Sequence, residues 1–395
     1  MDTIEDGTLD RIRGSRKRAR ANARSVAALT DNPGCTRRRV IDAASVQAFE
    51  LAADLGYPAK RGQSPFAITS GNRFEKRLKD DRYKLLAEAL RPFVDLPTEG
   101  LRFEKVDVRG LKFGVPWLEA RARRTDELLA TIARGDPAAP HIVDHPVLVF
   151  EIAGTPVYLE PDALALRTGN QLQLVEIKSY PVIDGQADPG KLSATGGQAA
   201  VYLLALRMAL RRLGFDPDVL RWSVILVAPR NFGRAATAHE IPLRKKAMAL
   251  ERVLRAIPAT GSLLDRLRPG FTLDVDPGPA SSPDRRRKTL EGAVRTLPML
   301  YVPECLAGCD MARFCRQQAI DDDDPARLGR TARDELAGVP TLADALRLAT
   351  SGRKPSEKEL ADVADALQHA HHALRRARAM APKACGVGGS KRSRP

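Results

Sequence analysis

The sequence predicts an α/β protein in which helices flank a small mixed sheet, followed by an additional helical C-terminal region. Apolar residues recur at three- and four-residue intervals over residues 39–55 and 70–96, which is typical of amphipathic helices. Short β-rich runs fill residues 146–180, and the helical pattern returns over residues 325–380. With 395 residues, 43% of them hydrophobic, the chain is long enough to bury a sizeable core.

The β-rich region contains three runs, at residues 146–154, 155–167 and 172–180. Gly154 separates the first two and Gly169-Asn170 the last two, so we expect an antiparallel meander. A helix is predicted next, over residues 197–213, and the continuous apolar run at 222–228 predicts a fully buried strand. Residues 277–287 are rich in Pro, Gly and Ser, which predicts a linker or exposed loop.

Charge is concentrated at the two ends of the chain. The formal net charge is +15, and residues 1–30 and 371–395 together carry +10 of it. We expect residues 1–30 and 381–395 to be basic disordered tails, because they contain too little apolar surface to order. The remaining divisions are a main domain at residues 31–320 and a helical region at 321–380. A basic chain favours polyanionic partners.

Several classes of protein are excluded. No apolar run approaches the roughly 20 residues that span a bilayer, so we expect no membrane partner. The first 24 residues mix acidic residues with arginine and lack the apolar segment of a secretory signal. The expected location is the cytoplasm, with the nucleoid as the alternative. Phosphate-loop and dinucleotide-binding motifs are absent, which argues against an NTPase or a dinucleotide enzyme.

Two carboxylates and a lysine occur in the second and third predicted strands. Asp162 lies in the second strand, and Glu176 and Lys178 lie in the third. Antiparallel pairing would bring the carboxylates together, and residues two apart on a strand point to the same side. With the Ile177 carbonyl, the carboxylates form a partial shell for Mg²⁺ or Mn²⁺. Lys178 would then orient the attacking water, although an isolated Glu-x-Lys is usually solvated or ion-paired.

The residues around these groups resemble the RecB-like branch of the PD-(D/E)XK nuclease superfamily. The matching motifs are Pro161-Asp162, Glu176-Ile177-Lys178 and residues 198–202 (QAAVY), in that order. The resemblance covers most of residues 35–315 and implies a restriction-endonuclease-like core that hydrolyses DNA phosphodiester bonds. In that branch an upstream helix supplies another acidic residue. Residues 71–75 (GNRFE) resemble that motif, which makes Glu75 a further metal ligand, directly or through water.

Gln198 and Tyr202 lie four residues apart, so they share one face of the predicted helix. The resemblance implies that they position the lysine, the nucleotide or a phosphate. Outside this context, a tyrosine in so apolar a helix would be a core residue.

Four cysteines form a second constellation. Cys35 precedes the first predicted helix, and Cys305, Cys309 and Cys315 are spaced C-x₃-C-x₅-C. Four thiolates suit tetrahedral zinc or a cubane cluster. The arrangement resembles the iron-sulfur members of the superfamily, the AddB-type and CRISPR-adaptation exonucleases, although their first gap is one residue shorter. The resemblance implies a structural [4Fe-4S] cluster, with zinc or unligated cysteines as alternatives. Cys385, in the basic tail, is a bystander.

Together the motifs predict a Mg²⁺- or Mn²⁺-dependent deoxyribonuclease, with exonuclease action expected, in DNA repair, recombination or defence against foreign DNA. The predicted partners are DNA, single-stranded or with free ends, and a helicase or a repair or defence protein, since the chain has no helicase motif. One alternative is a non-catalytic DNA-binding or scaffolding subunit of the same fold. Another is a zinc-stabilised nucleic-acid-binding protein.

Overall fold

The computed structural model describes residues 2–19, 22–59, 65–107, 114–152, 155–167, 171–231, 233, 235–256, 260–274, 282–302, 305–336, 338–352 and 355–380. The chain forms two compact units, the first made of Met1–Met299 with Pro303–Phe314 and the second of Leu300–Val302 with Cys315–Pro395. The first unit contains helices and strands, and the described part of the second unit is helical. Among the described residues, no helix is both long and apolar enough to cross a membrane.

The first unit is mixed α/β. Its helices are α1 (Asp2–Arg13), α2 (Ala23–Asp31), α3 (Thr36–Ala43), α4 (Ala48–Asp54), α5 (Pro65–Leu90), α6 (Val115–Ala133), α7 (Pro189–Arg212), η1 (Pro217–Val219), α8 (Arg244–Ala256), α9 (Thr260–Leu264), α10 (Pro283–Arg295) and α11 (Cys305–Gly308). Its strands are β1 (Phe103–Lys105), β2 (Ile142–Asp144), β3 (Leu148–Ile152), β4 (Thr155–Leu159), β5 (Ala163–Arg167), β6 (Gln171–Ile177), β7 (Leu220–Pro229) and β8 (Ala236–Pro242). Helix α12 (Ala312–Asp321) begins in this unit and ends in the second.

Six strands form one mixed sheet in the order β1-β2-β5-β6-β7-β8. The pairs β1–β2 and β6–β7 are parallel, and the other three are antiparallel. Strands β3 and β4 form a separate antiparallel pair. The structure is therefore an α/β fold with a mixed sheet, as predicted.

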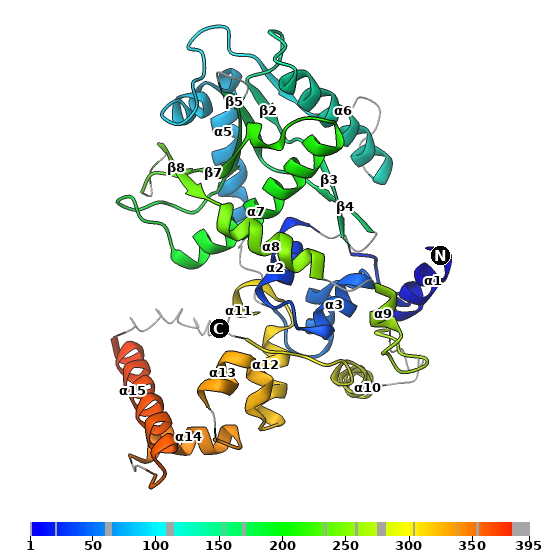
Figure 1. Ribbon diagram of the computed structural model, residues 1–395, viewed down its shortest axis with the longest axis vertical. Coiled ribbons are helices and arrows are strands. Elements are labelled where there is room, and N and C mark those ends of the chain that lie inside the picture. The colour runs from blue at the N-terminus through cyan, green and yellow to red at the C-terminus, as the bar shows by residue number, and fades with distance from the viewer. Residues whose placement is uncertain are drawn as a thin grey trace, which may run out of the picture. The chain divides into compact units, whose positions relative to one another are not determined.

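Helices α5 and α7 cover opposite faces of this sheet (Figure 1). Along β6, Leu172 and Leu174 pack into the core that contains α7, whereas Val175 and Ile177 pack into the core that contains α5. This alternation follows from the two-residue repeat of a strand. The same alternation shows which face of the sheet a polar side chain of β6 lies on.

The strand predictions need three corrections. The second predicted strand is two strands, β4 and β5, which belong to different sheets. The break falls at Pro161, which has no N–H to donate to a ladder. The three runs are therefore not one meander, and β1, β2 and β8 were not predicted because β1 and β2 are only three residues long and β8 is weakly apolar. The expected turn at Gly169-Asn170 lies outside the described residues, as does Gly154.

The helix predictions differ mainly at their ends. The segment 39–55 is two helices, α3 and α4, separated by a turn in which Ser45 has a positive φ of 53°. Helix α7 begins at Pro189, eight residues before the predicted start, because Asp188 caps it by accepting from the Lys191 N–H. Part of the expected 277–287 linker is the first turn of α10.

The first 30 residues are not a disordered tail, because they include α1 and α2. Ile12 and Val26 are each only 1% exposed. The Leu273 N–H donates to the Ile12 carbonyl, and the Arg16 guanidinium donates to the Leu273 carbonyl. A few well-spaced apolar residues are thus enough to dock this segment despite its charge.

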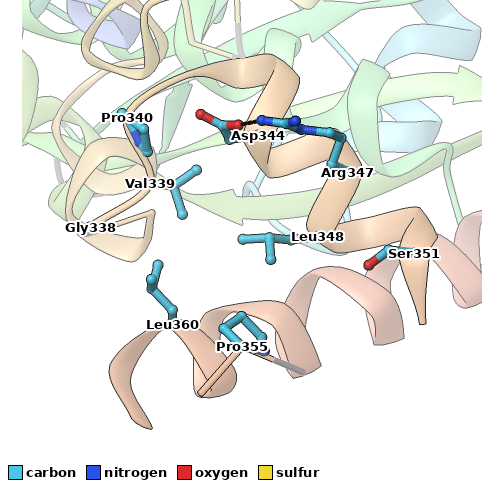
Figure 2. Close-up of a pocket in the computed structure, with 9 residues that line it drawn as sticks. All are labelled: Gly338, Val339, Pro340, Asp344, Arg347, Leu348, Ser351, Pro355 and Leu360. Atoms are coloured by element: carbon cyan, nitrogen blue, oxygen red, sulfur yellow. Dashed lines mark hydrogen bonds and ion pairs between the residues drawn. The ribbon is translucent and has the colours of Figure 1, made fainter. Parts of the chain in front are cut away.

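The second unit is helical in its described part, as expected for residues 321–380. Its elements are η2 (Pro325–Leu328), α13 (Arg330–Glu335), α14 (Leu342–Ser351) and α15 (Lys358–Met380). An open pocket of about 420 Å³ lies between α14 and the start of α15, lined by Val339, Leu348 and Leu360 and by the Asp344–Arg347 ion pair (Figure 2). None of the predicted site residues lines it. Residues 381–395, including Cys385, lie outside the described chain.

Candidate active site

The sheet brings Asp162 and Glu176 together at the ends of β5 and β6. Ala163 pairs with Val175, so Asp162, which immediately precedes β5, lies opposite Glu176. Asp162 Oδ2 accepts a hydrogen bond of 2.7 Å from the Ile177 N–H. The expected juxtaposition of the two carboxylates is confirmed, although Asp162 lies just before its strand rather than within it.

Lys178 lies on the same side as both carboxylates. Its Nζ is 2.6 Å from Glu176 Oε2 and 3.9 Å from Asp162 Oδ2. Because Val175 and Ile177 face α5, Glu176 faces α7. We call Asp162, Glu176 and Lys178 the Glu176 cluster.

Glu176 is fully buried and incompletely bonded. Its Oε1 has no hydrogen-bond partner among the residues that the structure describes. Burial, together with the charge on Asp162, raises the pKa of Glu176 to about 8 despite the neighbouring Lys178. Burial also raises the pKa of Asp162. This cluster therefore holds more acceptors, and more negative charge when ionised, than one lysine satisfies.

Helix α7 contributes Gln198 and Tyr202 beside this cluster. Gln198 Nε2 donates to the Tyr202 hydroxyl at 2.9 Å, so the two predicted residues do share one face. Tyr202 is mostly buried, and its burial and the charge on Glu176 raise its pKa. Tyr202 is thus a neutral hydroxyl, near enough to Glu176 to feel its charge.

Glu75, the third predicted acidic residue, has other partners. Its Oε1 lies 2.5 Å from Lys79 Nζ and 3.3 Å from His145 Nε2. Its charge contributes to raising the pKa values of Asp162 and Glu176, so it is close to the Glu176 cluster. The structure therefore places Glu75 near the two carboxylates but in contact with a lysine and a histidine.

Asp144 and His145 were not predicted as site residues; Asp144 is the last residue of β2, and His145 follows it. Asp144 pairs with Ala163 and is 2% exposed, and the His145 N–H donates to the Asp162 carbonyl at 3.2 Å. The signal was an Asp-His pair at the end of a short apolar run, but three residues are too few to reveal a strand period.

Asp144 is fully bonded on the α5 face of the sheet. Its Oδ1 lies 2.5 Å from Lys79 Nζ and 2.9 Å from His145 Nδ1, and its Oδ2 accepts from the Tyr83 hydroxyl at 2.8 Å. Burial opposes its ionisation, but His145 and Lys79 lower its pKa to about 2. We call Glu75, Lys79, Tyr83, Asp144 and His145 the Lys79 cluster.

Two local features of helix α5 bear on the site. Gly71 lies against Ser179, just beyond Lys178, where an added Cβ would come within 3.3 Å of the serine side chain. Further along, Asp80–Tyr83 depart from helical geometry, with positive φ at Asp81, Arg82 and Tyr83. Lys79 lies just before this break and Tyr83 is its last residue, and the two side chains approach different oxygens of Asp144.

The donor set of the Glu176 cluster suits a hard divalent cation. Asp162 and Glu176 supply oxygen ligands, and the Ile177 carbonyl is part of the same segment. The orphan Glu176 Oε1 is an acceptor that a cation would satisfy. Within the described ranges, no group of three or more His, Cys, Asp or Glu side chains is placed so that it could hold a metal ion by itself. Water or substrate oxygens would complete any shell.

Cys35, Cys305, Cys309 and Cys315 form no disulfide bond, and Cys35, Cys305 and Cys315 are buried. Asn32 Nδ2 donates to Cys305 Sγ at 3.3 Å, and the Asn32 carbonyl accepts from the Cys35 N–H. Burial raises the pKa of Cys309, while the Arg38 guanidinium counteracts it. Cys35, Cys305 and Cys309 belong to the first unit, and Cys315 lies beyond its boundary on α12.

Comparison of the chain with protein-family models and with curated proteins finds no match.

Proposed function

We propose that the protein is a Mg²⁺- or Mn²⁺-dependent nuclease with a PD-(D/E)XK core, which hydrolyses DNA phosphodiester bonds at the Glu176 cluster. The observation that carries this proposal is the buried, incompletely bonded Glu176 carboxylate opposite Asp162 and beside Lys178. Buried carboxylates with raised pKa values and one nearby lysine are common features of metal-dependent hydrolytic sites.

Each residue of the site has a role in this proposal. Asp162 and Glu176 hold the metal, which when bound polarises the phosphate and neutralises developing negative charge. Lys178, released from its pairing with Glu176, orients the attacking water and adds positive charge beside the phosphate. Gln198 and Tyr202 offer an amide and a hydroxyl to the substrate from α7. Glu75 adjusts the charge of the site from α5.

The cysteines complete the proposal. Cys35, Cys305, Cys309 and Cys315 would ligate a structural [4Fe-4S] cluster, with zinc as the alternative. Arg38 beside Cys309 favours the thiolate that either metal requires. Two measurements distinguish these metals, namely the iron and sulfide content and the absorption of visible light. An iron-sulfur cluster gives a coloured protein, whereas a zinc protein is colourless.

The test is cleavage of end-labelled single- and double-stranded DNA by anaerobically purified chain with Mn²⁺ or Mg²⁺. We expect Lys178→Ala to lower the rate by at least about 10²-fold, as for removal of one group that stabilises a transition state. Lys288→Ala, at an exposed lysine of α10, is the matched control. Terminal mononucleotides would show exonuclease action, and internal fragments endonuclease action.

Absence of cleavage by folded wild-type chain on every substrate would favour a DNA-binding or scaffolding subunit. Equal rates for wild type and Lys178→Ala would reject the Glu176 cluster as the site of hydrolysis.

A further inference from the structure

Helix α15 extends beyond the part that packs against α14 (Figure 1). In its first half, Ala364 is fully buried, and the Gln368 amide donates to the Leu348 carbonyl of α14 at 3.1 Å. Residues 372–380, by contrast, are all exposed. This exposed segment is about 13 Å long, and a helix that short is marginal in water without packing. The end of α15 is therefore a helical surface that the chain itself does not cover.

The two halves of α15 differ in charge. Residues 358–365 contain one lysine and three acidic residues, whereas residues 366–380 contain three arginines and no acidic residue. We call these three residues, Arg375, Arg376 and Arg378, the α15 arginines. Asp365 is the last acidic residue of the sequence, and residues 381–395 add four more lysines and arginines. The exposed half of the helix therefore carries positive charge alone.

The α15 arginines have no ion pair or hydrogen bond with any residue that the structure describes. Exposed arginines elsewhere, such as Arg255 and Arg347, pair with a carboxylate on their own helix. Basic residues in the last turn of a helix interact favourably with its dipole. Only Arg378 lies in the last turn of α15, so the dipole does not account for Arg375 and Arg376.

The α15 arginines lie on one side of the helix. Successive residues are about 100° apart around the axis, so the three fall within an arc of about 160°. The other exposed residues in that arc are His372 and Ala379, neither of which is acidic. A guanidinium group can donate two parallel hydrogen bonds to a phosphate. This side of α15 thus presents three phosphate-binding groups within two turns.

We propose that the C-terminal half of α15 binds the phosphate backbone of duplex DNA through the α15 arginines, without reading the base sequence. Charge complementarity selects this partner, because duplex DNA presents closely spaced negative charges along its length. The choice of DNA among polyanions rests on the proposed function. In this division of roles, the second unit holds DNA and the Glu176 cluster of the first unit cleaves it.

The test is the salt dependence of binding of the full-length chain to a labelled DNA duplex, followed by fluorescence anisotropy in chelator so that no cleavage occurs. Each phosphate contact contributes about 0.9 to the slope of log affinity against log salt concentration. Replacement of all three α15 arginines by glutamine should lower the slope by about 2 to 3 and weaken binding by at least about 10-fold. Glutamine is a good helix former, so α15 should remain helical.

A matched triple variant removes the same charge from other helices. Lys76→Gln, Arg255→Gln and Arg347→Gln neutralise side chains that are 76%, 77% and 78% exposed and that each pair with a carboxylate. The matched variant should change the slope by less than about 1, because these cations already have protein partners. Replacement of the α15 arginines by lysine keeps their charge and should preserve the slope.

Cleavage rates separate this inference from the proposed function. The glutamine variant should raise KM and leave kcat unchanged, because it weakens binding away from the reacting phosphate. Weaker binding by the glutamine variant of a chain that cleaves no DNA would support the role of α15 and contradict the proposed nuclease. Cleavage of DNA by a chain whose binding does not depend on the α15 arginines would do the reverse.

An unchanged slope in the glutamine variant would overturn the inference. An equal loss in the matched variant would also do so, because binding would then follow net charge and not this helix. Wild-type binding to vesicles of anionic phospholipid but not to duplex DNA would assign the surface to a membrane instead. If circular dichroism shows that the glutamine variant loses helix, Arg376→Gln alone provides the test, with an expected fall in slope of about 1.

Discussion

The Glu176 cluster and the Lys79 cluster lie at the same end of the six-stranded sheet, on its α7 and α5 faces respectively. Each contains two carboxylates and one lysine. In the Lys79 cluster, His145 and Tyr83 add further donors, and the pKa of Asp144 falls to about 2. In the Glu176 cluster, burial and the proximity of Asp162 raise the pKa of Glu176 to about 8. At Asp144, His145 and Lys79 together outweigh the effect of burial on the pKa, whereas at Glu176 the single Lys178 does not outweigh burial and the charge on Asp162.

The difference shows how a fold can contain a fully bonded and an incompletely bonded acidic group on two strands of one sheet. Buried carboxylates are costly unless they are paired and hydrogen-bonded. The Lys79 cluster meets that requirement with the chain's own residues, whereas the Glu176 cluster leaves Oε1 without a partner in the described part of the chain. The Glu176 cluster, whose negative charge is not fully balanced by Lys178, is therefore the better candidate for binding a metal ion.

Glu176→Gln should separate the clusters most strongly. It keeps the size of the side chain but removes a proposed metal ligand, so we expect DNA cleavage to fall by at least about 10²-fold. The metal-free chain should remain folded, because a buried and poorly paired carboxylate is lost. Cleavage rates and thermal midpoints measure both effects. Glu151→Gln, at an exposed glutamate of β3, should change neither. Full cleavage activity in Glu176→Gln would show that the Glu176 carboxylate is not needed for hydrolysis and would remove the proposed functional difference between the two clusters.

Asp144→Asn should have the opposite profile, with stability as its main effect. It removes an acceptor and a negative charge from beside Lys79 and Tyr83, and we expect it to cost about 2 kcal/mol of the free energy of unfolding. Urea unfolding measures this cost. Asp126→Asn, which weakens a more exposed pair with Arg212, should cost less than about 0.5 kcal/mol. Equal costs would show that the Lys79 cluster does not stabilise the fold.

The stability of the metal-free chain should depend on pH through Glu176. Its folded pKa of about 8 lies above the ordinary 4.5, so the folded state binds more protons than the unfolded state between those values. Stability should therefore fall as pH rises from about 5 to 8, and Glu176→Gln should lack that component. The measurement is the difference between the two thermal midpoints in chelator at each pH. A constant difference would contradict the raised pKa.

Gly71→Ala should have a small effect that reports on the placement of α5. The added Cβ would come within 3.3 Å of Ser179, so the helix or the Lys178 segment must shift slightly. We expect a few-fold loss of cleavage, reversed by a second change, Ser179→Gly. The control is Gly292→Ala in α10, where no atom lies within 4 Å of the new Cβ. That control should gain about 1 kcal/mol of stability from helix propensity.

Three segments show which features of the fold the sequence patterns predicted correctly and which they did not. The run at 222–228 is long and apolar, and it is β7. The 155–167 run also has strand character, but Pro161 divides it between two sheets, which composition alone does not reveal. The N-terminal segment is highly charged yet docks through Ile12 and Val26, so local polarity was a poor guide to order there.

The sequence alone determined that Asp162 and Glu176 share one end of a sheet, because strand pairing and two-residue alternation follow from local pattern. It also placed Gln198 and Tyr202 on one helical face. Only the tertiary structure decided that Lys79, Asp144 and His145 join Glu75, since these residues come from α5 and from the end of a three-residue strand. Such contacts depend on how distant elements pack, and a local pattern carries no record of that packing.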